Sequence, residues 1–421
     1  MKPLRLGIIP LSDCAVLAVA KEKGFFRRHG VEVTLSREVS WANVRDKVAA
    51  GALDGAQMLA GMPLAASVGI DPLARPLITA LSLDLNGNAV TVSTDLWKRM
   101  VRADPEATTK RPIGAGALKK VIEEDRRSGR PLLRFAVVYP FASHNYELRY
   151  WLAAAGIDPE NDVRLVVVPP PRMVEYLERE AIDGFCVGEP WSSLAVQHDL
   201  GRIVVTKYEI WNNSPEKVFA VSPAFAEERA EEHRALLRAL LEAAAWTDAA
   251  ENRAEVARLL ADERYVGAAE PLLRASLSGR LLASPDEAPL ELPDFHVFHR
   301  YAASFPWISH AAWLLLQMIR WGQMTEPIDV LATARSVYRP DLHREAARDI
   351  GLAAPATDVK TEGAHAGAWS LADGDGGTIA MGADLFIDGR PFDPAKTVEY
   401  LAESAVSDLR VSLDALAARN G

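Results

Sequence analysis

The sequence predicts an α/β protein with two similar lobes, because one pattern of strands and helices occurs twice along the chain. The first copy contains the strand-like runs LRLGIIP at residues 4–10 and VEVTLS at residues 31–36, and later the segment ALDGAQM at residues 52–58. The second copy has LLRFAVVYP at residues 132–140, VRLVVV with its core at residues 164–168, and EAIDGFCV at residues 180–187. Helix-like stretches separate the runs in both copies. Two such units predict lobes that face each other across a ligand cleft.

Two segments are expected to carry the chain between the lobes. Residues 78–92 lie between the two copies and contain a turn signal, NGN, at residues 86–88. Residues 204–222 follow the second copy and form the return crossing. We therefore assign residues 1–83 and 204–352 to lobe one, residues 84–203 to lobe two, and residues 353–421 to a C-terminal extension.

Local signals place the first helices. Gly24 is expected to end a helix over residues 14–23, and Ser40 is a suitable N-cap for a helix over residues 41–50. The apolar residues 58–68 predict a buried core helix.

Helices are also expected later in the chain, over residues 94–127, residues 223–261 with a break near Thr247, and residues 302–321. From Ala353 onward, many small and polar residues predict either a loop-like extension or a mobile segment. The apolar spacing of residues 392–421 suits an amphipathic helix.

Composition argues against direct nucleic-acid binding. The 421 residues carry 47 basic and 57 acidic side chains, and the net charge of −10 is unlike the basic footprint of most such proteins. Two distant cysteines, Cys14 and Cys186, do not form a disulfide framework. The N-terminal apolar run is too short for a signal peptide, and no stretch reaches the length of a membrane span. If the sequence is complete, we expect a cytoplasmic protein.

Two loops have the arrangement of an anion site, because each follows a strand and leads into a helix N-terminus. They are PLSD before the helix at Cys14, and PFASHN, which contains Ser143 and His144. The alternative is that Ser143 or Asn145 acts only as a helix N-cap. Two further signals are Gly188 in GEPW, where the backbone can approach a ligand closely, and Lys217 in NNSPEKVFAV. A solvated surface side chain is the alternative for this lysine.

No catalytic motif is present in the sequence. It lacks a nucleophile elbow, a zinc-protease motif, a phosphate-binding loop and paired CxxC motifs. The cluster His296, His299 and His310 lacks convincing zinc spacing and favours core or surface histidines. We therefore expect a binding protein that is not an enzyme and has no cofactor.

Several segments together resemble solute receptors of the nitrate, bicarbonate, sulfonate and thiamine-precursor group. They are KEKGFFRRHGVEVTL at residues 21–35, SREVSWANVRDKVAAGALDGAQMLAGMPLA at residues 36–65, SHNYELRYWLAAAGI at residues 143–157, IDGFCVGEPW at residues 182–191 and NSPEKVFAV at residues 213–221. The likeness covers most of residues 1–340 and points to the nitrate/bicarbonate-binding branch. It implies a bilobal periplasmic-binding-protein-like fold (type II) with two α/β lobes joined by two crossings.

Because a leader and a lipoprotein cysteine are missing, the chain resembles cytoplasmic nitrate/nitrite sensors of the NasS type. This resemblance implies a partner: an RNA-binding transcription antiterminator with an ANTAR domain, held inactive until nitrate or nitrite arrives. One alternative is the substrate-binding subunit of a nitrate or bicarbonate ABC transporter. Another is an enzyme like the thiamine-pyrimidine synthases, which would need a phosphopyridoxal-type ligand and reactive His/Cys chemistry.

Carried over residue by residue, the resemblance implies a nitrate site made by Trp41, Asn88, His144, Gly188 and Lys217. Asn88 departs from the pattern, since transporter relatives tend to carry the longer Gln there. Nitrate is a planar anion with acceptors only. A flat wall from Trp41, a cation from Lys217 and a donor from His144 in either protonation state suit such an anion.

Lys217 also bears on the choice of anion. In the resemblance, bicarbonate receptors have a carboxylate at this position, and an acidic side chain there would repel nitrate by about 1–4 kcal/mol. Lys217 therefore predicts nitrate, with nitrite similar in charge and acceptors. An anion that contacts both lobes is expected to close them and to release a partner that prefers the open form.

Overall fold

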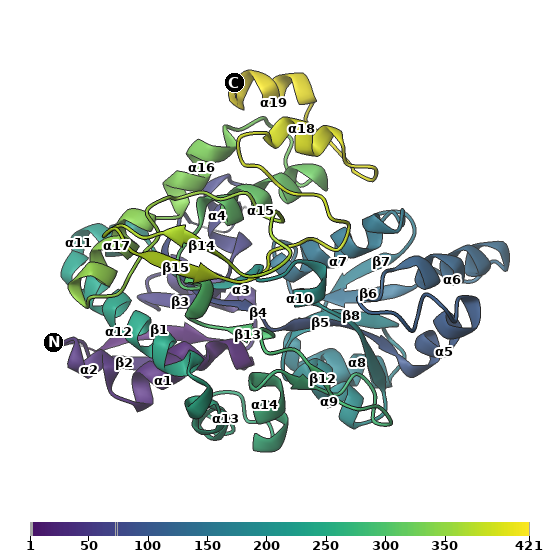
Figure 1. Ribbon diagram of the computed structural model, residues 1–421, viewed down its shortest axis with the longest axis horizontal. Coiled ribbons are helices and arrows are strands. Elements are labelled where there is room, and N and C mark those ends of the chain that lie inside the picture. Colours follow the sequence, from purple (N-terminus) through teal and green to yellow (C-terminus); the bar gives the residue numbers. More distant parts are fainter. Residues whose placement is uncertain (1–2, 72, 74, 421) are drawn as a thin grey trace.

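The computed structural model describes residues 3–71, 73 and 75–420, and it contains the two predicted α/β lobes (Figure 1). Lobe one is built on a six-stranded sheet with the order β13-β4-β10-β3-β1-β2, and lobe two on a five-stranded sheet with the order β7-β6-β8-β5-β9. Each sheet combines three parallel strands with antiparallel strands beside them. The doubling of one plan is therefore confirmed.

The lobe-one sheet consists of β1 (Leu4–Ile8), β2 (Val33–Arg37), β3 (Gly55–Leu59), β4 (Ile78–Asn86), β10 (Pro215–Val221) and β13 (His296–Val297). The helices in its first part are α1 (Ala15–Glu22), α2 (Phe25–Arg28), α3 (Trp41–Ala49) and α4 (Gly61–Ser67), with a short 3-10 helix at Ser12–Cys14. As predicted, the Ser40 hydroxyl caps α3 by accepting from the Asn43 backbone N–H at 3.2 Å. The single core helix predicted over residues 58–68 is wrong at its start, because Met58 pairs with Val218 as part of β3.

The lobe-two sheet consists of β5 (Asn88–Ser93), β6 (Arg134–Val137), β7 (Arg164–Val167), β8 (Gly184–Gly188) and β9 (Gly201–Thr206). Its helices are α5 (Thr94–Ala103), α6 (Gly116–Arg127), α7 (Ser143–Ala154), α8 (Met173–Glu178) and α9 (Trp191–Gln197), with a 3-10 turn at Pro170–Arg172. The predicted helical residues 94–127 are thus two helices with an irregular link.

The two predicted crossings are present. Between β4 and β5 lies Gly87, whose φ is +82° and whose added Cβ would come within 2.6 Å of the His296 ring, so the turn requires glycine. The return crossing leaves β9, forms α10 (Lys207–Ile210) and enters β10. Thr206 and Glu209 form a capping box that starts α10.

The return part of the chain is largely helical. It comprises α11 (Pro223–Glu228), α12 (Ala230–Asp248), α13 (Arg253–Leu260), α14 (Glu270–Leu277), α15 (Ile308–Arg320), α16 (Val330–Val337) and α17 (Pro340–Asp349), the small strands β11 (Arg280–Leu281) and β12 (Leu290–Glu291), and 3-10 turns at Ala250–Asn252 and Arg300–Ala302. The break predicted near Thr247 is confirmed where α12 ends. The helix predicted over residues 302–321 begins only at Ile308, because Pro306 cannot donate a backbone hydrogen bond and favours extended geometry before it.

The C-terminal extension covers lobe one and reaches the middle of the molecule (Figure 1). It contains the hairpin β14 (Trp369–Ala372) and β15 (Thr378–Met381), followed by α18 (Thr397–Ala402) and α19 (Leu413–Asn420). The single terminal helix expected over residues 392–421 is therefore wrong. Backbone hydrogen bonds of 2.9 Å from Asn212 to Leu385 and 2.8 Å from Ile387 to Ile210 attach the extension to the return crossing.

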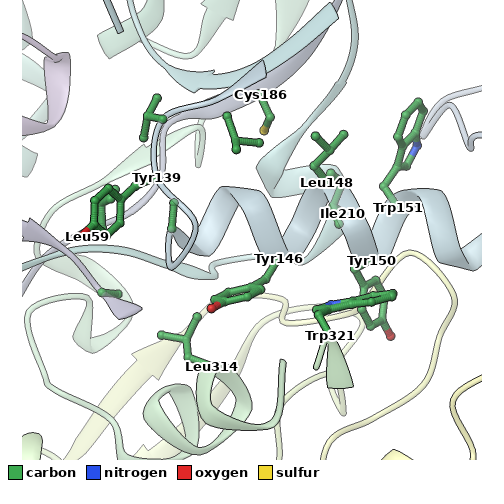
Figure 2. Packing of buried hydrophobic residues seen from close by; sticks show 14 of the residues in the cluster. Leu59, Tyr139, Tyr146, Leu148, Tyr150, Trp151, Cys186, Ile210, Leu314 and Trp321 are labelled. Carbon is green, nitrogen blue, oxygen red and sulfur yellow. The ribbon is translucent and has the colours of Figure 1, made fainter. Parts of the chain in front are cut away.

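One hydrophobic core continues from one lobe into the other. Figure 2 shows Tyr146 and Tyr150 on the side of α7 that faces Leu314 and Trp321, while Trp151 lies on the opposite side of the helix. Because α7 belongs to lobe two and α15 to lobe one, this contact holds the two lobes together. No helix in the described ranges combines the length and apolarity needed to cross a membrane.

We expect Trp313→Ala to lower the free energy of unfolding by about 3–5 kcal/mol, the usual cost of removing a large buried aromatic side chain. Trp313 is fully buried on α15, with ring centroids 4.8 Å from Trp211 and 6.0 Å from Phe386. Urea unfolding measures the change, and Leu132→Ala, at a 48% exposed position, should change it by less than about 0.5 kcal/mol. Equal effects of the two substitutions would contradict this assignment of the core.

Candidate functional site

The structure brings all five predicted site residues to one place between the lobes. Lys217 on β10 lies with its Nζ 5.5 Å from the ring centroid of Trp41, the first residue of α3. His144, in the first turn of α7, contacts Glu216, which is bonded to Lys217. Asn88, at the start of β5, is paired in register with Gly188 at the end of β8. An anion in contact with these residues would therefore touch both lobes.

Gly188 joins the two halves of this arrangement. A Cβ at this position would lie 3.0 Å from the Asn88 Oδ1 and 3.3 Å from the Asp13 Oδ2. That Asp13 oxygen is 2.6 Å from the Lys217 Nζ. The absence of a side chain at Gly188 thus keeps room beside both the amide and the ion pair.

The sequence predicts that Lys217 supplies the cation of the site, and the structure places two carboxylates beside it. Its buried ammonium lies 2.6 Å from Asp13 and donates to Glu216 Oε1 at 2.6 Å. Burial disfavours the ammonium, but these carboxylates raise the pKa of Lys217 above its ordinary value. The cation is therefore permanent, and its charge is largely balanced before any ligand arrives.

Glu216 is the centre of the polar cluster. Its Oε1 accepts from Lys217, and its Oε2 accepts from Lys207 Nζ at 2.7 Å and from the Ser143 hydroxyl. Burial alone would raise the pKa of Glu216, but Lys207, Lys217 and His144 together hold it well below its ordinary value. Glu216 is therefore an ionised carboxylate that ties β10 to α7 and α10.

The spacing of residues along a strand does not predict Glu216 as a site residue. Neighbours on a regular strand point to opposite faces of the sheet, so Glu216 should face away from Lys217. In the structure, the pairing of β10 with β4 shifts register on both sides of Lys217. Such a bulge re-aims side chains and brings both charged groups to the same site.

Asp13 could have been predicted as a site residue from the sequence, because it lies in PLSD, one of the two loops predicted to bind an anion. Its side chain instead binds the Lys217 ammonium, and its Oδ1 accepts from Gln57 Nε2. Gln57 in turn accepts from the Ile9 backbone N–H at 2.9 Å. Burial raises the pKa of Asp13 despite the attraction of Lys217. The first loop therefore supplies an acceptor to the site.

The prediction that His144 offers a donor in either protonation state needs correction. Its Nδ1 is 2.8 Å from Glu216 Oε1, and an ionised carboxylate can only accept. The Nδ1 proton is therefore committed to Glu216. Burial lowers the pKa of His144, although Glu216 opposes this shift. In the neutral ring the remaining nitrogen, Nε2, is an acceptor.

Several buried polar atoms around the cluster have no hydrogen-bond partner within the described residues. They are Trp41 Nε1, both side-chain atoms of the Asn88 amide, His144 Nε2 and Ser12 Oγ. Buried polar atoms are normally paired, so an unpaired group of this size indicates a place where a small polar ligand is bound. Trp41 Nε1 and Asn88 Nδ2 are donors, Asn88 Oδ1 and the neutral His144 Nε2 are acceptors, and the Ser12 hydroxyl can act as either, so the set can pair with a small ligand that brings acceptors.

The other sequence candidates take structural roles. Asn145 donates to the Pro140 carbonyl at 2.7 Å, and Ala142 stands at the N-cap of α7, so the N-cap alternative for Ser143 and Asn145 is wrong. His296 stacks on Phe298 with ring centroids 5.7 Å apart, and His310 packs edge-on against Trp211 at 5.6 Å.

The comparisons with known proteins agree with this fold. Residues 1–261 match the NMT1-like family. The chain belongs to this family. The nitrate/nitrite binding protein NrtA from Nostoc sp. is 33% identical over 404 residues, which are 94% of this chain and 84% of that protein. The crystal structure of the periplasmic nitrate-binding protein NrtA from Synechocystis superposes with a TM-score of 0.84 at 28% identity, covering 96% of this chain and 99% of that one.

A longer relative is the nitrate import ATP-binding protein NrtC from Synechocystis sp., 36% identical over 414 residues, which are 97% of this chain and 56% of that protein. The chain thus spans about half the length of the ATP-binding relatives that it matches. A bicarbonate-binding protein, CmpA from Synechococcus elongatus, is also among its homologues. The predicted periplasmic-binding-protein-like fold is confirmed, and the relatives that align over most of their length are binding proteins.

Glu189, next to Gly188, gives a test of the electrostatics. Burial raises the pKa of Glu189 from 4.5 to about 7. The unfolded chain therefore loses this proton first, and stability falls as the pH rises from 4.5 to about 7. Glu189→Gln removes the ionisation, so its melting temperature relative to the wild type should be higher at pH 8 than at pH 5.

Differential scanning calorimetry at the two pH values measures this change. The matched control is Glu403→Gln, the same substitution at a side chain that is 72% exposed. A Glu189→Gln difference that is the same at pH 5 and pH 8 would show that this carboxyl is not held in its neutral form.

Proposed function

We propose that this protein binds nitrate or nitrite between its lobes, as the substrate-binding component of an import system. The observation that carries the proposal is the convergence of Trp41, Asn88, His144, Gly188 and Lys217 on one buried place with unpaired polar atoms. The relatives support it, because they include proteins named for nitrate import and nitrate binding.

The chemistry of the site suits a small planar anion. The Asn88 amide N–H, the Trp41 indole N–H and the Ser12 hydroxyl are available donors, and Lys217 adds a permanent charge. The Trp41 ring, only 1% exposed, supplies an apolar wall. Nitrate and nitrite offer only acceptors, which match this set of donors.

Bicarbonate is a second candidate ligand, which one feature of the site favours. Its O–H needs an acceptor, and the neutral His144 Nε2 is a buried acceptor without a partner in the described chain. The balanced charge around Lys217 also weakens the argument that this lysine selects nitrate by charge alone.

The sensor role predicted from the sequence is a second candidate function for the protein. It requires the same anion site and adds a cytoplasmic location and an ANTAR-type antiterminator as partner. Its support is the resemblance and the net charge of −10, which suits a basic RNA-binding partner. In this role nitrate would favour the closed form and the partner the open form, so each would weaken binding of the other by the same factor.

We expect Asn88→Ala to weaken nitrate binding about 10- to 100-fold, the cost of losing one hydrogen bond to a charged group. Because the Asn88 side chain has no partner in the described protein, its removal should leave the melting temperature nearly unchanged. Calorimetric titration with nitrate, nitrite and bicarbonate measures the affinities.

Asn86 is the matched control, two residues away. Its amide donates to Asp294 O at 2.7 Å and to Asn213 at 3.2 Å, so Asn86→Ala should lower the melting temperature. Retention of full nitrate affinity in folded Asn88→Ala would remove Asn88 from the site. Failure of folded wild-type protein to bind any of these anions would refute the proposed function.

The two roles predict different partners for the native protein. A sensor should be captured from cell extract together with an RNA-binding protein, and addition of nitrate should release that protein. A transport component should instead be recovered with membrane permease subunits. Finding the native protein outside the cytoplasm, with no nitrate-released partner, would exclude the sensor role.

A further inference from the structure

The hydrogen bond between His144 and Glu216 determines which nitrogen of His144 carries a proton, and therefore which ligands the ring can bind. The Glu216 carboxylate receives four donors: Lys217 and His144 on Oε1, and Lys207 and Ser143 on Oε2. A carboxylate has about four acceptor positions, so this one is filled. The two ammonium groups keep it ionised, and an ionised carboxylate has no proton to give.

His144 must therefore carry a proton on Nδ1, at 2.8 Å from Glu216 Oε1. In a neutral imidazole only one nitrogen is protonated, so Nε2 then holds a lone pair. This nitrogen is buried and unpaired within the described residues, at the same site as the unpaired Asn88 amide. A nitrate oxygen placed against Nε2 would meet a lone pair with its own lone pairs.

We propose that Glu216 is a specificity-determining residue: it fixes the His144 proton on Nδ1, so that an acceptor-only anion binds together with one proton, which His144 takes up on Nε2. The step forms one N–H bond on the ring, and the proton comes from solvent. An anion with its own O–H could instead donate to Nε2 without this uptake. The inference rests on the proposed binding of nitrate at this site.

The charged groups around His144 make the ring responsive to a ligand. On β10 the ring contacts Glu216, and the charges of Lys217 on the same strand and Lys207 on α10 also act on it. Glu147, one turn further along α7, lies 3.0 Å from Lys207 and balances part of that charge. Asp13 from the first loop neutralises part of the Lys217 charge. Burial and the lysines lower the pKa of His144 without a ligand, with Glu216 opposing them. An added anion shifts this balance toward the imidazolium form.

Linkage then fixes the sign of the pH dependence. If binding takes up one proton, nitrate affinity falls as the pH rises, by at most about tenfold per pH unit above the pKa of the unliganded ring. The decisive measurement is calorimetric titration of the intact protein with nitrate at several pH values. Each titration is repeated in two cationic buffers of different ionisation enthalpy, which gives the number of protons bound.

We expect uptake of close to one proton per nitrate by the wild type above neutral pH. His144→Gln, whose amide always offers a donor, should bind nitrate with no uptake and a flat pH profile. His198→Gln, the same substitution at an exposed position, should behave as the wild type does. If it remains folded, Glu216→Gln should also reduce the uptake, because an amide no longer fixes the Nδ1 proton.

The possible results distinguish the proton-uptake inference from the proposed nitrate-binding function. Nitrate binding by the wild type with no proton uptake and no pH dependence would overturn the role of Glu216 and His144 while leaving the proposed function intact. Proton uptake that persists in His144→Gln would also overturn it. If folded wild-type protein fails to bind nitrate at every pH, the proposed function is wrong and this inference falls with it.

Discussion

The contact on which the site depends is the buried carboxylate of Glu216. Glu216 lies on lobe-one strand β10 beside Lys217, with which it is paired. It joins that strand to the first turn of a lobe-two helix through Ser143 and His144, and to the return crossing through Lys207. Charges removed from water cost several kcal/mol each unless they are paired and hydrogen-bonded. These groups therefore hold one another in place, and separation of the lobes must break the contacts between Glu216 and α7.

Apolar packing supports the same contact between the lobes. Tyr146 and Tyr150 of α7 lie against the α15 region (Figure 2). The Tyr150 hydroxyl donates to Asp388 of the extension at 2.8 Å. The extension also bonds to the crossing beside Trp211. The return crossing and the site are thus neighbours, because Lys207 at the start of α10 donates to Glu216.

The sequence was informative where local rules apply and less so where they are overridden. Repeated strand signals predicted both sheets, and Ser40 and Gly24 marked helix ends through capping and a positive φ of 75°. The resemblance named five residues that do converge. The sequence did not predict Glu216 as a site residue, because a bulge in β10 overrides the two-residue period of a strand. The hydrogen bond that holds the His144 proton on Nδ1 could not be predicted either, because it joins residues far apart in the chain.

Charge balance changes how anion selectivity must be understood. Lys217 alone would favour any monovalent anion over a neutral molecule, yet Asp13 and Glu216 already compensate it. Nitrate, nitrite and bicarbonate carry the same charge, so a screened Coulomb term cannot tell them apart. Discrimination then rests on which buried atoms donate and which accept, because an unmatched polar atom costs about 1–3 kcal/mol. The Asn88 amide offers both kinds of atom, and the protonation of His144 Nε2 decides the balance.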